Sequence, residues 1–123
     1  MIQGTIRSGC GRASQAFQPA RMAELQQRFG WTPYPGTLNV AVMALDAAVL
    51  SLGEPVFRSE HNTPIGPLQW WPVLIRTERT GTVNGLLVRG ARTGTRYLEL
   101  VSRLSFRAAG CQNGDLVSIQ RAP

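Results

Sequence analysis

The sequence predicts a small, mostly β barrel with one main helix. Many short apolar or alternating runs are separated by turn residues, and only one segment has a clear helical pattern. The length of 123 residues suits one domain, residues 1–123, with a substantial core. A composition of 43% apolar and 16% charged residues is typical of a globular soluble protein.

The N-terminal part is expected to form a strand, a helix and a second strand. "MIQGTIRSG" alternates apolar and polar residues and leads into the glycine-rich "GCGRAS". In "PARMAELQQRFG", Met22, Leu25 and Phe29 recur at helical spacing between a proline and a glycine. "TPYPGT" is a turn cluster, "LNVAVMAL" predicts a strand, and "DAAVLSLG" fits either a helical turn or a short strand.

The rest of the chain is expected to consist mainly of strands. "EPVFRSEHNTPIGPLQWWPVLIRTERTG" holds four prolines, which predict short strands and a long loop. "TVNGLLVRG", "RYLELVSRL" and "DLVSIQR" are three β-like runs separated by turns. Between the last two, "SFRAAGCQNGD" predicts a short helical turn followed by a tight turn at Asn113, Gly114 and Asp115.

The net charge of +6 comes from arginine alone, because the chain contains no lysine. This absence excludes Schiff-base and P-loop lysine chemistry, whereas arginines bind phosphate through forked hydrogen bonds. We therefore expect an anionic ligand. The arginines are scattered along the chain and form no dense run, which argues against specific nucleic-acid binding.

Other composition features point to a cytoplasmic protein. No window approaches the roughly 18 unbroken apolar residues of a membrane span. "MIQGTIRSGCGR" lacks the pattern of a secretory signal, so the cytoplasm is the expected compartment. Cys10 and Cys111 are too few for a disulfide scaffold or a zinc site, and both are expected to be free thiols.

A glycine-containing loop is the first candidate site. It comprises Gly9, Cys10, Gly11, Arg12, Ala13 and Ser14. Its backbone N–H groups could converge on a phosphate, with Arg12 supplying charge, although a bare G-x-G is more often a simple turn. The loop is neither a Walker loop nor a Rossmann fingerprint.

Thr37 and Asn39 form the second candidate site, at the start of a predicted strand. Residues two apart in an extended chain face the same side, so their oxygens could serve a hard cation such as Mg²⁺. From spacing alone, hydrogen bonding within the turn is the favoured interpretation. Glu99, on another predicted strand, could face solvent or accept a proton from a hydroxyl nucleophile.

The remaining candidates have mainly structural interpretations. His61 lies in a polar loop without a matching triad motif, so we expect a surface role. Trp70 and Trp71 could stack on a planar ligand, but a place in the core is favoured. Arg103 and Arg107 could reach phosphate or ribose, or form solvated pairs.

Three segments, taken in order, indicate a family. They are "GTIRSGCGRASQAF", "LQQRFGWTPYPGTLNVAV" and "RYLELVSRLSFRAAGCQNGDLVSI". Together they resemble the archaeal-type CTP-dependent riboflavin kinase family, whose pattern is a G-x-G loop, a helix ending near "pypGTLN", and a C-terminal "LE" followed by "LR" and "GD-V-I". "PYPGTLNV" is the most specific match, and residues 46–69 show none.

The resemblance implies a six-stranded cradle-loop barrel that transfers the γ-phosphoryl group of CTP to the 5′-hydroxyl of riboflavin. By position, residues Gly9 to Ser14 and the segment Leu104, Ser105, Phe106 and Arg107 would bind the nucleotide. Thr37 and Asn39 would coordinate Mg²⁺, which reverses the preference drawn from spacing. Glu99 would contact the flavin as the candidate base, and Thr93 is matched to a flavin-contacting threonine.

The segment from Arg89 to Tyr97 departs from the family pattern, with Gly90 in place of a proline and no histidine. Arg12 also stands where the family often has an acidic residue. The altered segment motivates one alternative, a related kinase of another small alcohol. The scattered arginines motivate the other, a non-catalytic barrel that binds nucleotide or nucleic acid.

Overall fold

The structure, a computed structural model, confirms the mostly β fold, with one helix among the residues that it describes. It describes residues 2–8, 19–34, 36–43, 55, 57–58, 68–90 and 97–123. Within these ranges the elements are β1 (Ile2–Arg7), α1 (Pro19–Phe29), β2 (Leu38–Ala41), β3 (Phe57–Arg58), β4 (Leu68–Thr77), β5 (Gly81–Gly90), β6 (Tyr97–Ser102) and β7 (Leu116–Arg121).

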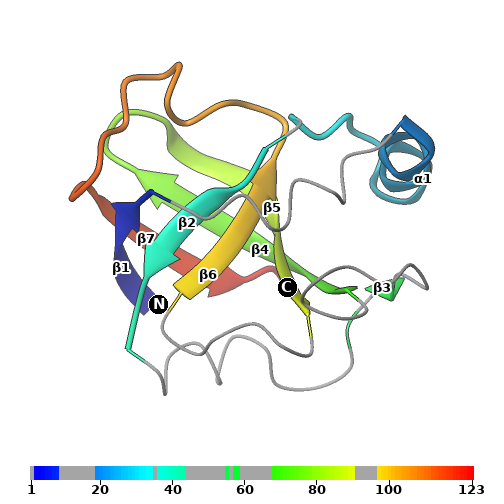
Figure 1. The fold of residues 1–123 in the computed structure, drawn as a ribbon, viewed down its shortest axis with the longest axis horizontal. Coiled ribbons are helices and arrows are strands. Elements are labelled where there is room, and N and C mark those ends of the chain that lie inside the picture. The colour runs from blue at the N-terminus through cyan, green and yellow to red at the C-terminus, as the bar shows by residue number, and fades with distance from the viewer. Residues whose placement is uncertain are drawn as a thin grey trace.

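Six of the strands form a closed antiparallel barrel (Figure 1). The sheet order is β3-β4-β5-β6-β2-β1-β7, and an additional pairing of β4 with β7 closes it. In that closing pair Val73 stands opposite Arg121 and Arg76 stands opposite Ser118. β3 is a short addition to β4 outside this ring. The barrel expected from the family resemblance is therefore present.

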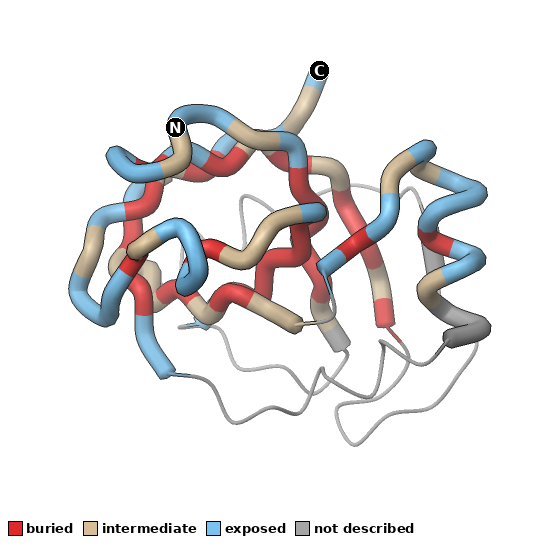
Figure 2. Tube along the Cα trace, turned by 90° about the horizontal axis from the view of Figure 1, so that it is seen from above, coloured by how far each residue is buried: buried red, intermediate tan, exposed pale blue. Residues whose placement is uncertain are grey.

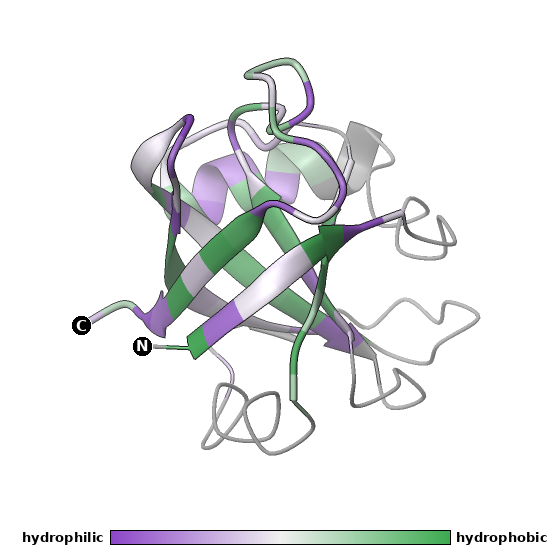
Figure 3. Ribbon diagram, turned by 90° about the vertical axis from the view of Figure 1, so that its left-hand side faces the viewer, coloured by the Kyte–Doolittle hydropathy of each residue, from purple (hydrophilic) through white to green (hydrophobic). Residues whose placement is uncertain are grey.

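Alternating side chains fill the barrel. Figure 2 shows buried residues along the strands and exposed residues in the turns, and Figure 3 shows hydrophobic and hydrophilic residues following one another along the ribbon of the strands. A period of two is expected when one face of a strand is buried. The barrel core consists of Ile6, Leu38, Val40, Trp71, Val73, Ile75, Leu87, Leu98, Leu100, Phe106, Cys111, Val117 and Ile119.

Helix α1 covers part of the outer surface of the barrel. Leu25 is fully buried, and it belongs to an outer cluster with Leu68, Trp70, Leu86, Val88 and Val101. Burial of one such leucine contributes roughly 2 kcal/mol. The Gly30 N–H donates to the Gln26 carbonyl at 2.8 Å and closes the last turn, which confirms the predicted C-terminal end.

Strand β4 corrects the expectation of only short strands in the middle of the chain. It runs for ten residues and includes Pro72. The Pro72 carbonyl accepts the Ala122 N–H at 3.1 Å, on the side where β7 ends. The nitrogen of Pro72, which carries no hydrogen, faces the same side. In an antiparallel pair both groups of one residue point the same way, so the ladder with β5 is kept.

Both tryptophans of β4 lie in apolar clusters, as favoured from the sequence. Trp70 has no exposed surface and belongs to the outer cluster, whereas Trp71 is 2% exposed and belongs to the barrel core. Cys111 is a buried free thiol. Cys10, His61 and "DAAVLSLG" lie outside the described residues. No helix among the described residues is long and apolar enough to cross a membrane.

Candidate functional site

A single helical turn after β6 presents the segment matched to nucleotide binding. Ser105 Oγ accepts the Ala108 N–H at 3.2 Å and so caps the start of the turn. At its end the Gly110 N–H donates to the Arg107 carbonyl, and the Cys111 N–H donates to the Phe106 carbonyl, both at 3.0 Å. This pair of bonds is a Schellman motif, and Gly110 has the positive φ of 99° that the motif requires.

The buried side chains of this turn anchor it to the barrel. Phe106 and Cys111, the residues that the Schellman motif brings together, are both in the barrel core. Arg107 lies between them in sequence and is exposed. The turn therefore holds Phe106 inside and presents Arg107 outside, which confirms the predicted helical turn and explains it.

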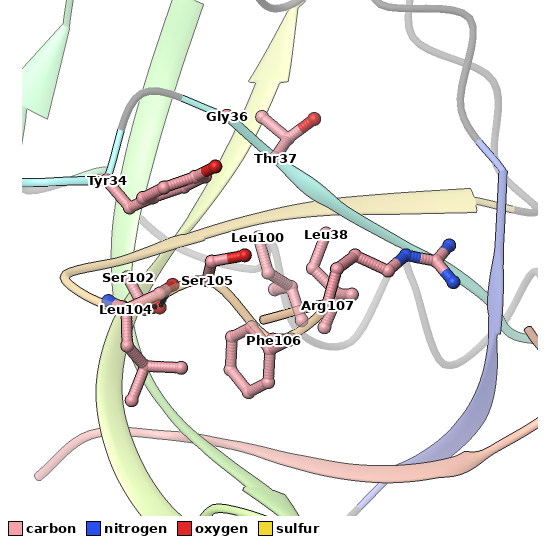
Figure 4. A pocket seen from close by; sticks show the side chains of 10 residues that line it. All are labelled: Tyr34, Gly36, Thr37, Leu38, Leu100, Ser102, Leu104, Ser105, Phe106 and Arg107. Carbon is pink, nitrogen blue, oxygen red and sulfur yellow. Dashed lines mark hydrogen bonds between the residues drawn. The ribbon is translucent and has the colours of Figure 1, made fainter. Parts of the chain in front are cut away.

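A pocket of about 140 Å³ opens between this turn and the segment before β2 (Figure 4). Tyr34 and Thr37 lie on one side of it, and Ser105 and Phe106 lie on the other. Among the described residues, the lining consists of Tyr34, Gly36, Thr37, Leu38, Leu100, Ser102, Leu104, Ser105, Phe106 and Arg107. The pocket thus brings Thr37 together with all four residues Leu104 to Arg107.

The pocket combines an apolar floor with a polar rim. Leu38, Leu100 and Phe106 belong to the barrel core, whereas Tyr34 and Arg107 are exposed. Apolar walls with a few fixed polar groups are typical of small-molecule sites, although this volume is below that of pockets for drug-sized ligands. The pocket can therefore hold one ring system rather than a whole nucleotide.

Two backbone hydrogen bonds hold Tyr34 and Gly36 beside the pocket. The Tyr34 N–H donates to the Ser102 carbonyl at 2.8 Å, and the Gly36 N–H donates to the Tyr34 carbonyl at 2.8 Å. A Cβ on residue 36 would lie 3.2 Å from Cε1 of Tyr34, which is tighter than side chains normally allow. Glycine at this position lets the tyrosine ring lie against the backbone.

Arg107 links the turn to the end of β1. Its guanidinium extends toward β1 (Figure 4), where Nη2 donates to the Arg7 carbonyl at 3.5 Å. The same nitrogen donates to Asn113 Oδ1 at 2.5 Å, and Asn113 Nδ2 donates to Ser8 Oγ at 3.0 Å. Because Ser8 directly precedes Gly9, this network connects the pocket turn to the residue before the glycine-containing loop.

Asn39 and Glu99 are direct neighbours across β2 and β6. Leu98 and Leu100 point into the barrel core, so Glu99 between them points outward, and Asn39 does so for the same reason between Leu38 and Val40. Asn39 is half-buried, while Glu99 is only 7% exposed. On its other side Glu99 stands opposite Val88 of the outer cluster.

The candidate residues thus form two adjacent groups. Thr37 lines the pocket, and Asn39 lies two residues further along, beside Glu99. Within the described ranges there is no group of three His, Cys, Asp or Glu side chains that could hold a metal ion. A cation here would therefore depend mainly on neutral side-chain oxygens and on the oxygens of a bound substrate. Gly9 to Ser14 and Thr93 lie outside the described residues.

A larger groove of about 630 Å³ lies away from these residues, against β4, β7 and the following turns. Arg76, Arg79, Glu78 and Asp115 line it, so its charges are mixed in sign. It contains none of the predicted site residues that the structure describes. We therefore place the candidate site in the smaller pocket. Arg89 of β5 is not among the residues that line the pocket, and burial lowers the pKa of its guanidinium.

Sequence reasoning did not assign a site role to Tyr34 or Asn113. The backbone partner of Tyr34 is Ser102, and the side-chain partners of Asn113 are Arg107 and Ser8. Asn113 does lie in the predicted tight turn, where the Asp115 N–H donates to the Gln112 carbonyl at 3.1 Å. The contacts of Tyr34 with Ser102 and of Asn113 with Ser8 join residues distant in sequence, so no local sequence pattern predicts them.

The fold defines a small barrel protein, and the pocket is its candidate site, between the segment before β2 and the turn after β6. Residues 6–120 match the family model CTP-dep_RFKase, described as a domain of unknown function, DUF120. The chain therefore belongs to the CTP-dependent riboflavin kinase family, whose name indicates a phosphotransferase. A comparison with curated proteins found no match.

Proposed function

We propose that this protein is a CTP-dependent riboflavin kinase, which transfers the γ-phosphoryl group of CTP to the 5′-hydroxyl of riboflavin and releases FMN and CDP. The family match over residues 6–120 carries the proposal. The pocket supports it, because Thr37 lies there with Leu104 to Arg107, the residues matched to metal and nucleotide binding.

The pocket is assigned to the cytosine ring. Its volume of about 140 Å³ suits one ring, and the floor of Leu38, Leu100 and Phe106 excludes water from the ring faces. Ser105 and Tyr34 offer hydroxyl groups for hydrogen bonds to the ring edge. The ribose and phosphates then lie outside the pocket, on the side of Thr37.

Mg²⁺ is proposed as the cofactor, with Thr37 and Asn39 as its protein ligands. Their neutral oxygens fit a hard cation that also binds nucleotide phosphates. Both side chains are half-buried, and the buried Leu38 lies between them in sequence. In an extended chain, residues on either side of an inward-pointing residue face the same way, so both oxygens can reach one ion. When bound, the ion neutralises phosphate charge.

Glu99 is proposed as the general base. It stands in register with Asn39, so a hydroxyl beside Glu99 is close to a phosphate held near Asn39. Glu99 accepts the proton of the riboflavin 5′-hydroxyl while the hydroxyl oxygen bonds to the γ-phosphorus. The bond between that phosphorus and the CDP oxygen breaks in the same step. Positioning and charge neutralisation provide most of the rate enhancement.

Chromatographic detection of FMN tests the proposal. The protein is incubated with riboflavin, Mg²⁺ and one of the four nucleoside triphosphates, and we expect FMN with CTP. Absence of FMN with every nucleotide contradicts the proposal. Phosphorylation of another small alcohol by CTP, with riboflavin inert, would instead favour a related kinase. Salt-dependent binding to duplex DNA without CTP affinity would favour the non-catalytic alternative.

A further inference from the structure

Arg7 lies at the end of a row of side chains that crosses three neighbouring strands. It stands opposite Asn39 on β2, and Asn39 stands opposite Glu99 on β6. Directly opposed residues of antiparallel strands share a face, with Cβ atoms about 4.5–5.5 Å apart. Ile6 and Val40 point into the barrel core, so this face is the outer one. Arg7, Asn39 and Glu99 are therefore consecutive neighbours outside the barrel.

The side chains of this row become more exposed toward Arg7. Glu99 is buried, Asn39 is half-buried and Arg7 is exposed. In the part of the chain that the structure describes, the Arg7 guanidinium makes no hydrogen bond or ion pair. Because Asn39 separates it from Glu99, its charge is not neutralised within the row. The guanidinium is thus available to an anionic ligand.

A second guanidinium approaches the same end of β1. Arg107 contacts the Arg7 carbonyl, but its Nη2 also donates to the side chain of Asn113. The Arg107 guanidinium is therefore held by hydrogen bonds, whereas that of Arg7 has no such bond among the described residues. The chain has no lysine, so arginine supplies its permanently positive side chains. Positive charge is therefore concentrated at this end of β1, where the row that leads to Glu99 begins.

We propose that Arg7 binds the γ-phosphate of the donor nucleoside triphosphate, an inference that rests on the proposed kinase function. The γ-phosphate must lie beside the acceptor hydroxyl, and hence near Glu99, which receives the hydroxyl proton. Arg7 is two strands away in the same row, with the candidate metal ligand Asn39 between them. Its planar guanidinium can form two parallel hydrogen bonds to phosphate oxygens.

Binding of CTP and of CDP, each with Mg²⁺ and without riboflavin, tests this role by isothermal titration calorimetry. We expect Arg7→Gln to weaken CTP binding about 10- to 100-fold, as for the loss of a charge-assisted bond, and to weaken CDP binding much less. Arg7→Lys keeps the positive charge but cannot form two parallel hydrogen bonds to the phosphate, so we expect an intermediate loss of CTP affinity. Circular dichroism and the Tm check that both variants fold.

Arg76→Gln is the matched control. Arg76 is also exposed and lies on β4 opposite Ser118, outside the row. We expect its CTP affinity to stay within about twofold of the wild type, since surface charges distant from a site contribute little. If Arg7→Gln matches Arg76→Gln, or weakens CTP and CDP equally, the γ-phosphate assignment is wrong.

The same measurements separate this inference from the proposed function. A wild-type protein that forms no FMN, yet loses CTP affinity selectively on Arg7→Gln, would contradict the kinase and support the phosphate contact. A wild-type protein that forms FMN with unchanged CTP affinity in Arg7→Gln would support the kinase and overturn the role of Arg7. A wild-type protein that does not bind CTP would overturn both.

Discussion

Replacing Gly110 by alanine tests whether the turn that carries Arg107 depends on a left-handed residue. Gly110 has a φ of 99°, and a Cβ added at this position would meet only Arg79 atoms at 3.7–3.8 Å, an ordinary van der Waals distance. The expected penalty is therefore backbone strain alone, about 1–3 kcal/mol. Alanine also restricts the unfolded chain, which offsets roughly 0.4–1 kcal/mol. We expect a net loss of about 1–2 kcal/mol in the free energy of unfolding.

Urea denaturation followed by tryptophan fluorescence measures this loss, because Trp70 and Trp71 are buried in the native state. The Tm should fall by roughly 4–8 °C, at about 4 °C per kcal/mol for a domain of this size. Gly110→Asn is the control, since asparagine tolerates positive φ better than alanine, and it should be less destabilised. An alanine variant as stable as the wild type, or less destabilised than Gly110→Asn, would refute the reasoning.

Two further predictions concern the chemistry of the site. Thr37→Ala and Asn39→Ala should each lower turnover at least about 100-fold and leave the Tm nearly unchanged, because each removes a proposed ligand from a half-buried position. Full activity in both variants, measured as FMN formation at saturating Mg²⁺, would exclude the metal assignment. Glu99→Gln should lower kcat about 10²- to 10⁴-fold at unchanged CTP affinity, since the amide cannot accept the proton. An unchanged kcat would rule out Glu99 as the base.

Local patterns in the sequence predicted most of the strands and the helix. The spacing of Leu25 and its neighbours predicted α1, and alternation predicted β7, in which Val117 and Ile119 face the barrel core. The length of β4 was not predicted, because a proline usually ends a strand. Pro72 is tolerated only because its amide faces the side where β7 ends. Such tolerance depends on a partner strand distant in sequence.

Part of the candidate site could be predicted, because the family resemblance assigned some of its residues by position. Thr37 and Leu104 to Arg107 were assigned by position, and the pocket brings them together. The row of Arg7, Asn39 and Glu99 was not predictable, because register between strands is set by long-range pairing. Tyr34 was missed as a pocket residue for a similar reason, since a bond to Ser102 fixes its place.

Transfer of a labelled γ-phosphoryl group tests the central claim most directly. The protein is incubated with CTP carrying ³²P at the γ-position, riboflavin and Mg²⁺, and the products are separated by chromatography. The kinase proposal predicts that the label appears in FMN and that CDP remains unlabelled. A label that stays in CTP or is released only as inorganic phosphate would contradict it.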